Sequence, residues 1–244
     1  MNLTRTPAMS RSATLGRTVK RLFMTGARVL DCEPVAEKFR LVTLESPQFR
    51  SVRWIAGQKI QIGLGSGFVT RTYTPIEWDA AVGQTRILGY LHGPGPGSAW
   101  LRHLKKGDEC DVVGPRISLD LEVTSGPPVV FGDETSIGIV WALAQRLSGP
   151  MVQGLLEVDS LPLVLRVLES LNLSTVELFQ RASCDAHLSE IECRLNQMPE
   201  EAKFILTGKA SSIQRMSRTL KELGVPRARL ATKAYWALGK AGLD

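Results

Sequence analysis

The segment Arg71-Thr72-Tyr73-Thr74-Pro75 has side chains that suit a charged aromatic cofactor. Arg71 carries a planar, permanently charged fork that can bind a pyrophosphate. On an extended segment, Tyr73 can lie against a flavin ring or its ribityl chain, and Thr74 can hydrogen-bond the reactive ring edge. We therefore predict that Arg71, Thr72, Tyr73 and Thr74 bind a flavin. The alternative is a surface strand in which Tyr73 and Thr74 only favour β-structure.

A second segment that could bind a phosphate runs from His92 to Trp100. Glycine allows the backbone to approach a pyrophosphate, and we predict that Ser98 caps a short helix whose free N–H groups face the anion. The predicted cofactor contacts here are His92, Gly93, Gly97 and Ser98. The glycines could instead form only a turn, and His92 could simply fill a strand end. Together, the two elements make a flavin reductase the leading hypothesis.

The composition is that of an ordinary globular protein, with 43% hydrophobic and 22% charged residues among 244. No apolar run approaches the roughly 20 residues needed to cross a bilayer, so no membrane partner is expected. The first thirty residues contain all of the charge excess and no Asp or Glu, and we expect residues 1–25 to be a basic tail or extension. No other basic, aromatic-interleaved face is visible, so no nucleic-acid partner is expected.

The cysteines and histidines show no ligand pattern. Cys32, Cys110, Cys184 and Cys193 form no CxxC pair, so we expect no disulfide framework and a cytoplasmic location. The three histidines share no metal-ligand spacing with them, and no bound metal is expected. A monomer is the default expectation.

The chain divides into two halves with different patterns. Short alternating runs separated by turns in residues 26–124 predict an antiparallel barrel or sandwich, and we expect a barrel with Greek-key connections. Strand and helix patterns alternate in residues 125–244, which predicts a parallel sheet wrapped by helices. The expected fold class is therefore β + α/β: an N-terminal flavin-binding β-barrel, then a C-terminal α/β nucleotide-binding domain. The clearest predicted strands of the barrel are 40–45, 58–64, 71–77, 86–91 and 109–113.

Helical periodicity predicts which residues of the second half face its core. In a helix after residue 158, the inward residues are Leu161, Val164, Leu165, Leu168 and Leu171. In a helix after residue 209, they are Ile213, Met216, Leu220 and Leu223.

Open parallel sheets bind nucleotides beyond the carboxyl ends of their strands. In this sequence those ends carry Gly132-Asp133-Glu134-Thr135, Arg181 and Lys209, which are candidates for nucleotide contacts. The first segment could equally be a structural strand-to-helix turn, because two acids repel a phosphate while complementing the helix dipole. Arg181 and Lys209 are candidates to bind a nucleotide phosphate or an anionic substrate, or could equally be solvated surface charges.

The C-terminal end has an aromatic pair flanked by lysines. Trp236, with Tyr235, could shield a flavin ring or could only pin the end of the chain by burying aromatic area. Lys233 and Lys240 flank the pair and would attract an anionic ferric complex.

The chain resembles the siderophore-interacting protein family, a branch of the ferredoxin-reductase-like flavoproteins. The matching motifs occur in family order: Arg71-Thr72-Tyr73-Thr74, His92-Gly93 through Gly97-Ser98 and Trp100, Gly107-Asp108, Gly114-Pro115-Arg116, Gly132-Asp133-Glu134-Thr135, and Lys233-Ala234-Tyr235-Trp236 with Gly239. Two positions depart from the family pattern: Lys209 stands where an acidic residue is common, and the segment 93–96 is unusually rich in proline.

The resemblance implies FAD bound at the barrel and reduction of ferric siderophores by NAD(P)H or reduced ferredoxin. It also implies that residues 132–135 face the nucleotide or the flavin, with Thr135 as the best single flavin contact. The flavin supplies the two-to-one electron chemistry, so no catalytic side chain is predicted. The partner would be a ferric siderophore or another anionic ferric chelate.

Two other functions are compatible with the sequence. One is a siderophore-binding or regulatory module without turnover, and the other is a general NAD(P)H–flavin reductase. The sequence leaves the siderophore, and the choice among NADH, NADPH and ferredoxin, undetermined, although Arg181 slightly favours NADPH over NADH.

Overall fold

The N-terminal half is a sheet of seven antiparallel strands. The computed structural model describes residues 24–64, 69–119, 121, 126–147 and 151–240, so most of the predicted tail lies outside the described residues. The strands are β1 (Thr25–Ala36), β2 (Phe39–Glu45), β3 (Lys59–Gly63), β4 (Thr70–Tyr73), β5 (Pro75–Asp79), β6 (Gln84–Tyr90) and β7 (Glu109–Arg116). Their order in the sheet is β4-β3-β7-β1-β2-β6-β5.

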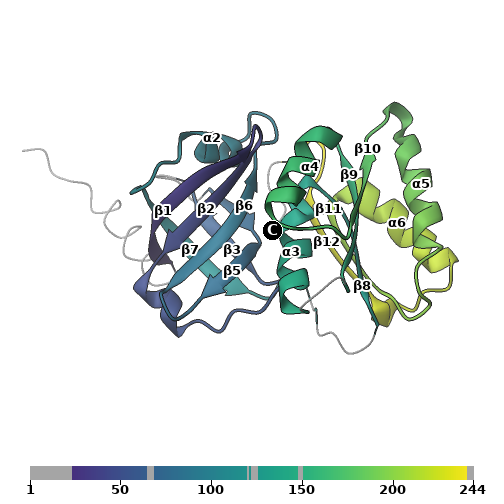
Figure 1. The fold of residues 1–244 in the computed structure, drawn as a ribbon, viewed down its shortest axis with the longest axis horizontal. Coiled ribbons are helices and arrows are strands. Elements are labelled where there is room, and N and C mark those ends of the chain that lie inside the picture. Colours follow the sequence, from purple (N-terminus) through teal and green to yellow (C-terminus); the bar gives the residue numbers. More distant parts are fainter. Residues whose placement is uncertain (1–23, 65–68, 120, 122–125, 148–150, 241–244) are drawn as a thin grey trace, which may run out of the picture.

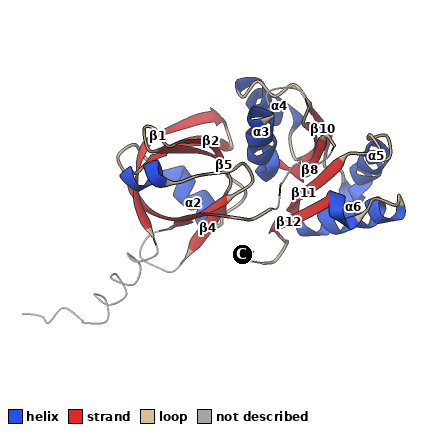
Figure 2. Cartoon of the chain, turned by 90° about the horizontal axis from the view of Figure 1, so that it is seen from below, coloured by secondary structure: helices blue, strands red, loops and turns tan. Residues whose placement is uncertain are grey.

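The two edge strands, β4 and β5, are joined through Thr74 alone, so the sheet curls into a barrel (Figures 1 and 2). The prediction of one strand over 71–77 is wrong, because β4 pairs with β3 whereas β5 pairs with β6. Pro75 lacks a backbone N–H and is therefore suited to the first position of β5. β2 and β3 are not neighbours in the sheet, and neither are β6 and β7, which is typical of Greek-key connections.

The C-terminal half is a parallel sheet of five strands in the order β10-β9-β8-β11-β12, as predicted for an α/β domain. The strands are β8 (Pro128–Asp133), β9 (Gln153–Val158), β10 (Val176–Gln180), β11 (Lys203–Lys209) and β12 (Leu230–Trp236). The helices are α3 (Ile137–Arg146), α4 (Leu161–Ser170), α5 (Ala186–Leu195) and α6 (Ala210–Glu222). Helices α3 and α4 lie between the sheet and the barrel, and α5 and α6 cover the other face (Figure 1).

Two predicted core positions are wrong. Leu165 is 49% exposed, because the buried face of α4 consists of Val164, Val167 and Leu168, and residue 165 projects away from that face. Leu223 is 43% exposed, because α6 ends at Glu222 and Leu223 is its C-terminal cap. Helix α5 and strand β12 were not predicted.

A single apolar core joins the two halves. It contains Phe39, Leu41 and Ile76 from the barrel together with the buried faces of α3 and α4. Gly138 on α3 makes this approach possible, since an added Cβ would lie 3.2 Å from Ile76 Cγ2. The predicted domain boundary at residue 124 lies outside the described residues; β7 ends at Arg116 and β8 begins at Pro128.

Candidate flavin and nucleotide site

A cavity of about 240 Å³ lies between the barrel and the α/β half. Its walls come from β4, the end of β6, the start of α2 (Pro96–His103), the start of α3 and the end of β12. Ten of the seventeen residues that line it were predicted as site residues: Arg71, Thr72, Tyr73, Thr74, His92, Gly97, Thr135, Lys233, Trp236 and Lys240. Predicted site residues separated by up to 169 positions, from Arg71 to Lys240, are therefore brought together at one site, beside Tyr73 where the flavin was expected.

One corner of the cavity is suited to bind a phosphate. The Arg71 guanidinium donates to the carbonyl of Thr70 at 2.7 Å, and no carboxylate among the described residues forms an ion pair with it. Helix α2 begins beside Arg71, because an added Cβ on Gly97 would lie 3.2 Å from Arg71 Cγ. The backbone N–H groups of Gly97 and Ser98 lie in the first turn of α2, where helices leave N–H groups unpaired.

The prediction that Ser98 caps this helix is wrong. Helix α2 begins at Pro96, and its N-cap is Gly95, which makes no side-chain capping bond. Proline is favoured in the first turn because its missing N–H would be unpaired there in any case. The buried Ser98 hydroxyl instead donates to the carbonyl of His92 at 3.2 Å and ties the glycine-rich turn to the helix.

Tyrosine hydroxyl groups border the floor of the cavity. The Thr74 and Tyr235 hydroxyl groups lie 3.4 Å apart and connect the bend between β4 and β5 to strand β12. Burial raises the pKa of Tyr235 to about 12 and raises the pKa of Tyr73 further. Both phenols therefore stay protonated at neutral pH and can donate hydrogen bonds.

Three rings from the two halves form one wall. His92 stacks between Tyr90 and Trp236, with ring centroids 6.1 Å and 6.5 Å away, respectively. Burial lowers the pKa of His92, so its ring is uncharged at pH 7. Trp236 thus touches the barrel from the C-terminal strand, where a flavin-covering residue was predicted.

The turn after β8 has a structural role. Asp133 is buried and caps the following helical turn by accepting hydrogen bonds from the backbone and hydroxyl of Thr135. Its other oxygen accepts from Trp236 Nε1 at 2.7 Å. Neither Gly132 nor Gly208 tolerates a Cβ, because the added atom would clash with Ser136 or Asp133. Of the residues 132–135, only Thr135 lines the cavity.

Arg181 lies at the carboxyl end of β10, but carboxylates surround its guanidinium. It donates to Glu134 at 2.9 Å and 3.2 Å and to Asp159 at 2.5 Å, and Glu157 lies 3.8 Å away. Desolvation lowers the pKa of Arg181, but Glu134, Asp159 and Glu157 together more than offset this, and the pKa lies above its ordinary range. Its charge is therefore engaged within the protein, and the predicted phosphate contact has no free guanidinium to make it.

The three predicted lysines lie in different surroundings. Lys233 and Lys240 line the cavity and form no ion pair among the described residues. Lys209 lies outside the lining, 3.9 Å from the Asp185 carboxylate. Arg71, Lys233 and Lys240 are therefore the three cationic residues that line the cavity, and no carboxylate is among its described lining residues.

A second cavity, of about 570 Å³, adjoins the first. Tyr90 and His92 line both cavities, and Gly93 lies only in the second. Lys38, Arg40, Arg102 and the acidic Glu37 border it from the barrel, and Asp159 borders it from the end of β9.

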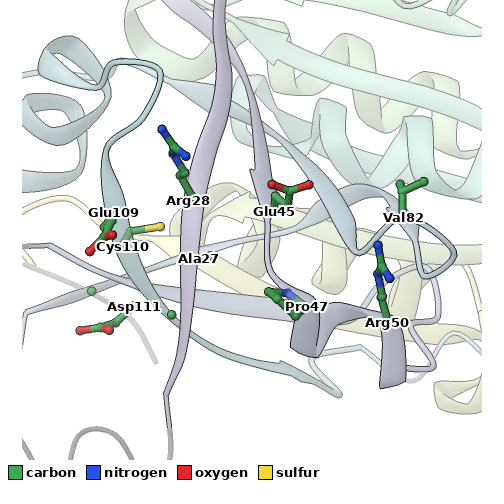
Figure 3. Close-up of a pocket in the computed structure, with 11 residues that line it drawn as sticks. Ala27, Arg28, Glu45, Pro47, Arg50, Val82, Glu109, Cys110 and Asp111 are labelled. Carbon is green, nitrogen blue, oxygen red and sulfur yellow. The ribbon is translucent and has the colours of Figure 1, made fainter.

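A third pocket lies at the other end of the barrel, among strands β1, β2 and β7 (Figure 3). Arg28 and Arg50 are mixed there with Glu45, Glu109 and Asp111, and no predicted site residue lines it. Burial raises the pKa of Cys110 to about 12, so its thiol is not activated. We do not assign a function to this pocket.

Sequence reasoning missed two features of the first cavity. Tyr90 ends β6 two residues before His92, and this spacing on one face of a strand was an available signal. Gly138 lines the cavity from α3, and no local pattern distinguishes it from other helical glycines. Within the described residues, no group of His, Cys, Asp and Glu could hold a metal ion, and no helix is long and apolar enough to cross a membrane. All four cysteines are free.

The residues of the first cavity fit a flavin nucleotide. The unpaired Arg71 and the first turn of α2 suit a pyrophosphate, and Gly97 leaves the space that a side chain would fill. Tyr73 and Trp236 provide aromatic surfaces for a planar ring.

Comparisons with known proteins agree with this geometry. Residues 63–119 match the model of the siderophore-interacting FAD-binding domain, which confirms the resemblance seen in the sequence and supports FAD as the cofactor of the barrel. No curated protein sequence gave a match.

Solved structures with low sequence identity share the whole architecture. A siderophore utilization protein from T. fusca has a TM-score of 0.74 at 21% identity, covering 91% of this chain and 95% of that one. The siderophore-interacting protein SipS from Aeromonas hydrophila has a TM-score of 0.72 at 20% identity, covering 90% and 93%. The flavohem-like FAD/NAD binding domain of a nitric oxide dioxygenase from Vibrio cholerae has 0.70 at 17%, covering 88% and 99%. The chain therefore has the ferredoxin-reductase-like fold.

Proposed function

We propose that this protein is an FAD-dependent reductase that passes electrons from NAD(P)H, or from reduced ferredoxin, to ferric siderophores. The observation that carries the proposal is the cavity between the two halves. It unites Arg71, the start of α2 and Trp236 at the place where the fold can bring a donor to a flavin. The match to the siderophore-interacting FAD-binding domain supports the substrate class.

Each residue of the cavity has a defined task in this proposal. Arg71 and the N–H groups of Gly97 and Ser98 would hold the pyrophosphate. Tyr73 and Trp236 would hold the ring, and the Thr74 hydroxyl would meet its polar edge. When bound, the flavin supplies the conversion of a two-electron donor into single-electron transfers. The protein side chains bind, orient and exclude water, so no acid–base pair is needed.

The charge of the cavity favours an anionic substrate. Lys233 and Lys240 lie at its lining beside Arg71, with no carboxylate among the described lining residues. Unpaired cations focus an attractive field on an approaching anion. Ferric iron is a hard cation that binds oxygen donors tightly, and ferrous iron binds them less tightly. Reduction is therefore the step that releases iron from the chelate.

The direct test begins with FAD uptake by the purified protein. The loaded protein is then mixed anaerobically with NADH, NADPH or reduced ferredoxin, followed by a ferric chelate and a ferrous trap. We expect bleaching of the flavin absorbance by at least one donor and formation of the coloured ferrous complex. Failure to take up FAD would refute the proposal. Flavin reduction without ferrous iron would instead indicate a general flavin reductase, and chelate binding without reduction would indicate a binding module.

We further propose that the protein acts as a monomer in the cytoplasm. The four free cysteines support a reducing compartment. A sedimentation measurement that gave a dimer at micromolar concentration would contradict the monomer.

A further inference from the structure

The carboxyl end of β9 lies in the wall of the second cavity. Asp159 is the first residue after β9, and its side chain is 56% exposed. In dinucleotide-binding sheets, an acidic residue near this position accepts a hydrogen bond from the adenosine ribose, and a basic residue accommodates the 2′-phosphate of the phosphorylated nucleotide. Both residue types are present here, as Asp159 and Arg181. The contacts of these two side chains determine whether NADH or NADPH can bind.

The arginine cannot serve a 2′-phosphate in this arrangement. Glu134 binds it through both oxygens, Asp159 binds it at 2.5 Å, and the buried Glu157 lies beside it. Three carboxylates therefore surround one guanidinium, and the group as a whole is negative when they are ionised. A 2′-phosphate placed here would meet this negative charge, and no cation of the α/β half is among the described residues that line the second cavity.

Buried contacts fix the arginine in this place. His187 accepts a hydrogen bond from the Ala182 N–H through Nδ1, so its Nε2 carries the proton and donates to Glu157 at 2.8 Å. Glu157 is fully buried, and its Oε1 has no hydrogen-bond partner among the described residues. The cluster thus has unused acceptor capacity at Glu157. Arg181 Nε also has no hydrogen-bond partner among the described residues, but it is buried and lies 3.8 Å from the Glu157 carboxylate.

Asp159 has an oxygen left for a ligand. Its Oδ1 accepts from Arg181, whereas its Oδ2 has only a long contact of 3.5 Å with the Tyr90 hydroxyl. Tyr90 also lines the first cavity, so Asp159 lies one side chain away from the predicted flavin site. The basic residues of the second cavity, Lys38, Arg40 and Arg102, can meet a pyrophosphate. Both nucleotides have that group, so these cations do not discriminate strongly between them.

We propose that the second cavity holds the adenosine diphosphate half of NADH, and that Asp159 accepts a hydrogen bond from the ribose 2′-hydroxyl. The three carboxylates around Arg181 exclude NADPH by repelling its 2′-phosphate. This inference rests on the proposed function, because it identifies the donor of the same reductase. It reverses the expectation that Arg181 would bind a nucleotide phosphate.

The test uses the FAD-loaded full-length protein and calorimetric titration with ADP-ribose and with its 2′-phosphorylated form. These probes lack the nicotinamide, so binding is measured without turnover. We expect ADP-ribose to bind about tenfold more tightly or better, as a hydrogen bond to a charged acceptor and the avoided repulsion imply. Asp159→Asn should reduce the ratio to about threefold or less, and Asp159→Glu should restore much of it. Glu169→Gln, which removes an exposed carboxylate of α4, should leave the ratio unchanged.

Tighter binding of the 2′-phosphorylated probe would overturn the inference, as would an unchanged ratio in folded Asp159→Asn. No binding of either probe would also overturn it, while FAD uptake and reduction by ferredoxin would still uphold the proposed function. Failure of FAD uptake is a separate outcome that refutes the function itself. Thermal unfolding of each variant shows whether it is folded.

Discussion

Arg71 and Arg181 are the two arginines predicted to bind phosphate, one in each half of the molecule. Arg71 lines an open cavity, donates a hydrogen bond to the carbonyl of Thr70 and forms no ion pair among the described residues. Arg181 is held by Glu134 and Asp159 at the end of the parallel sheet. The same residue type thus provides an available charge in the barrel and a neutralised one in the α/β half.

A cationic side chain can bind an external anion readily only when the carboxylates of its own protein leave it unpaired. In the barrel, Arg71 is unpaired among the described residues, and the N-terminus of α2 lies beside it in the first cavity. An external anion can therefore bind both groups. In the α/β half, the carboxylates of Glu134 and Asp159 already bind Arg181, so an external phosphate would have to displace them. A binding role is therefore expected for Arg71 and a structural, charge-balancing role for Arg181.

The strongest test of this contrast is Arg181→Ala. The substitution leaves Glu134 and Glu157 buried without their counter-charge, and breaking such a pair costs about 3 kcal/mol. We expect a loss of that size in the free energy of unfolding, measured with urea, and unchanged FAD affinity in the protein that remains folded. Equal stability would show that the cluster does not depend on Arg181.

Arg71→Ala should have the opposite profile. Removing a charge-assisted contact with a pyrophosphate should weaken FAD binding about 100-fold. Stability without FAD should change by less than about 0.5 kcal/mol, because Arg71 pairs with no carboxylate. Arg86→Ala removes a barrel arginine that pairs with Glu77 at the surface and should leave FAD affinity unchanged. The quenching of FAD fluorescence on binding gives the FAD affinity of the unmodified protein, Arg71→Ala and Arg86→Ala.

Trp236→Phe tests a hydrogen bond within the α/β half, between the ends of β12 and β8, that holds the Trp236 ring in the wall of the first cavity. The indole N–H satisfies the buried Asp133, and its loss leaves Asp133 Oδ2 without this donor. We expect destabilisation of about 1–2 kcal/mol by urea unfolding. Trp54→Phe is the matched control, since the buried Trp54 Nε1 has no partner among the described residues and its removal should cost less. Equal losses in both variants would argue against a structural role for the Asp133 contact.

The barrel site could be predicted because its signals are local. Arg71 to Thr74 and His92 to Ser98 are short motifs, and the structure places them at one cavity. The predictions at Ser98 and at residues 71–77 fail at element boundaries: the N-cap of the helix is Gly95, three residues before Ser98, and Thr74 interrupts the strand. The hydrophobic periodicity and composition of a segment indicate that a helix or strand is present. The residue at which that element begins or ends depends on how it packs against the rest of the protein.

The α/β edge could not be predicted, because its chemistry depends on distant partners. Glu134 and Arg181 are 47 residues apart, and Asp133 and Trp236 are 103 apart. No pattern within a segment shows that these charges and donors satisfy one another. The two acids beside the helix start, read as a structural turn in one of our alternatives, were the available signal that this edge repels phosphate.

A smaller effect is expected from Gly97→Ala. The new methyl group would lie 3.2 Å from Arg71 Cγ and 3.4 Å from the Tyr73 hydroxyl oxygen, so Arg71 would have to shift. We expect about fivefold weaker FAD binding, as for mild overpacking. Gly95→Ala is the matched control, since no atom lies within 4 Å of the added Cβ. If both variants bind FAD equally well, the close approach of α2 to Arg71 is not needed for the cofactor.

The smallest effect concerns pH and the carboxylates around Arg181. Burial raises the pKa of Glu134 in the folded protein, even though Arg181 opposes the shift. The protonated form is therefore favoured by folding, and the stability that it contributes is present at acidic pH and is lost as the pH rises through the folded pKa. Glu134→Gln cannot titrate, and Asp133, whose pKa burial also raises, is present in both proteins. The unfolding free energy of the unmodified protein minus that of Glu134→Gln should thus fall between pH 4 and pH 7. A difference that rises over this range would mean that the Arg181 pair outweighs burial, and that this end of the sheet resembles an ordinary salt bridge more than a desolvated acidic cluster.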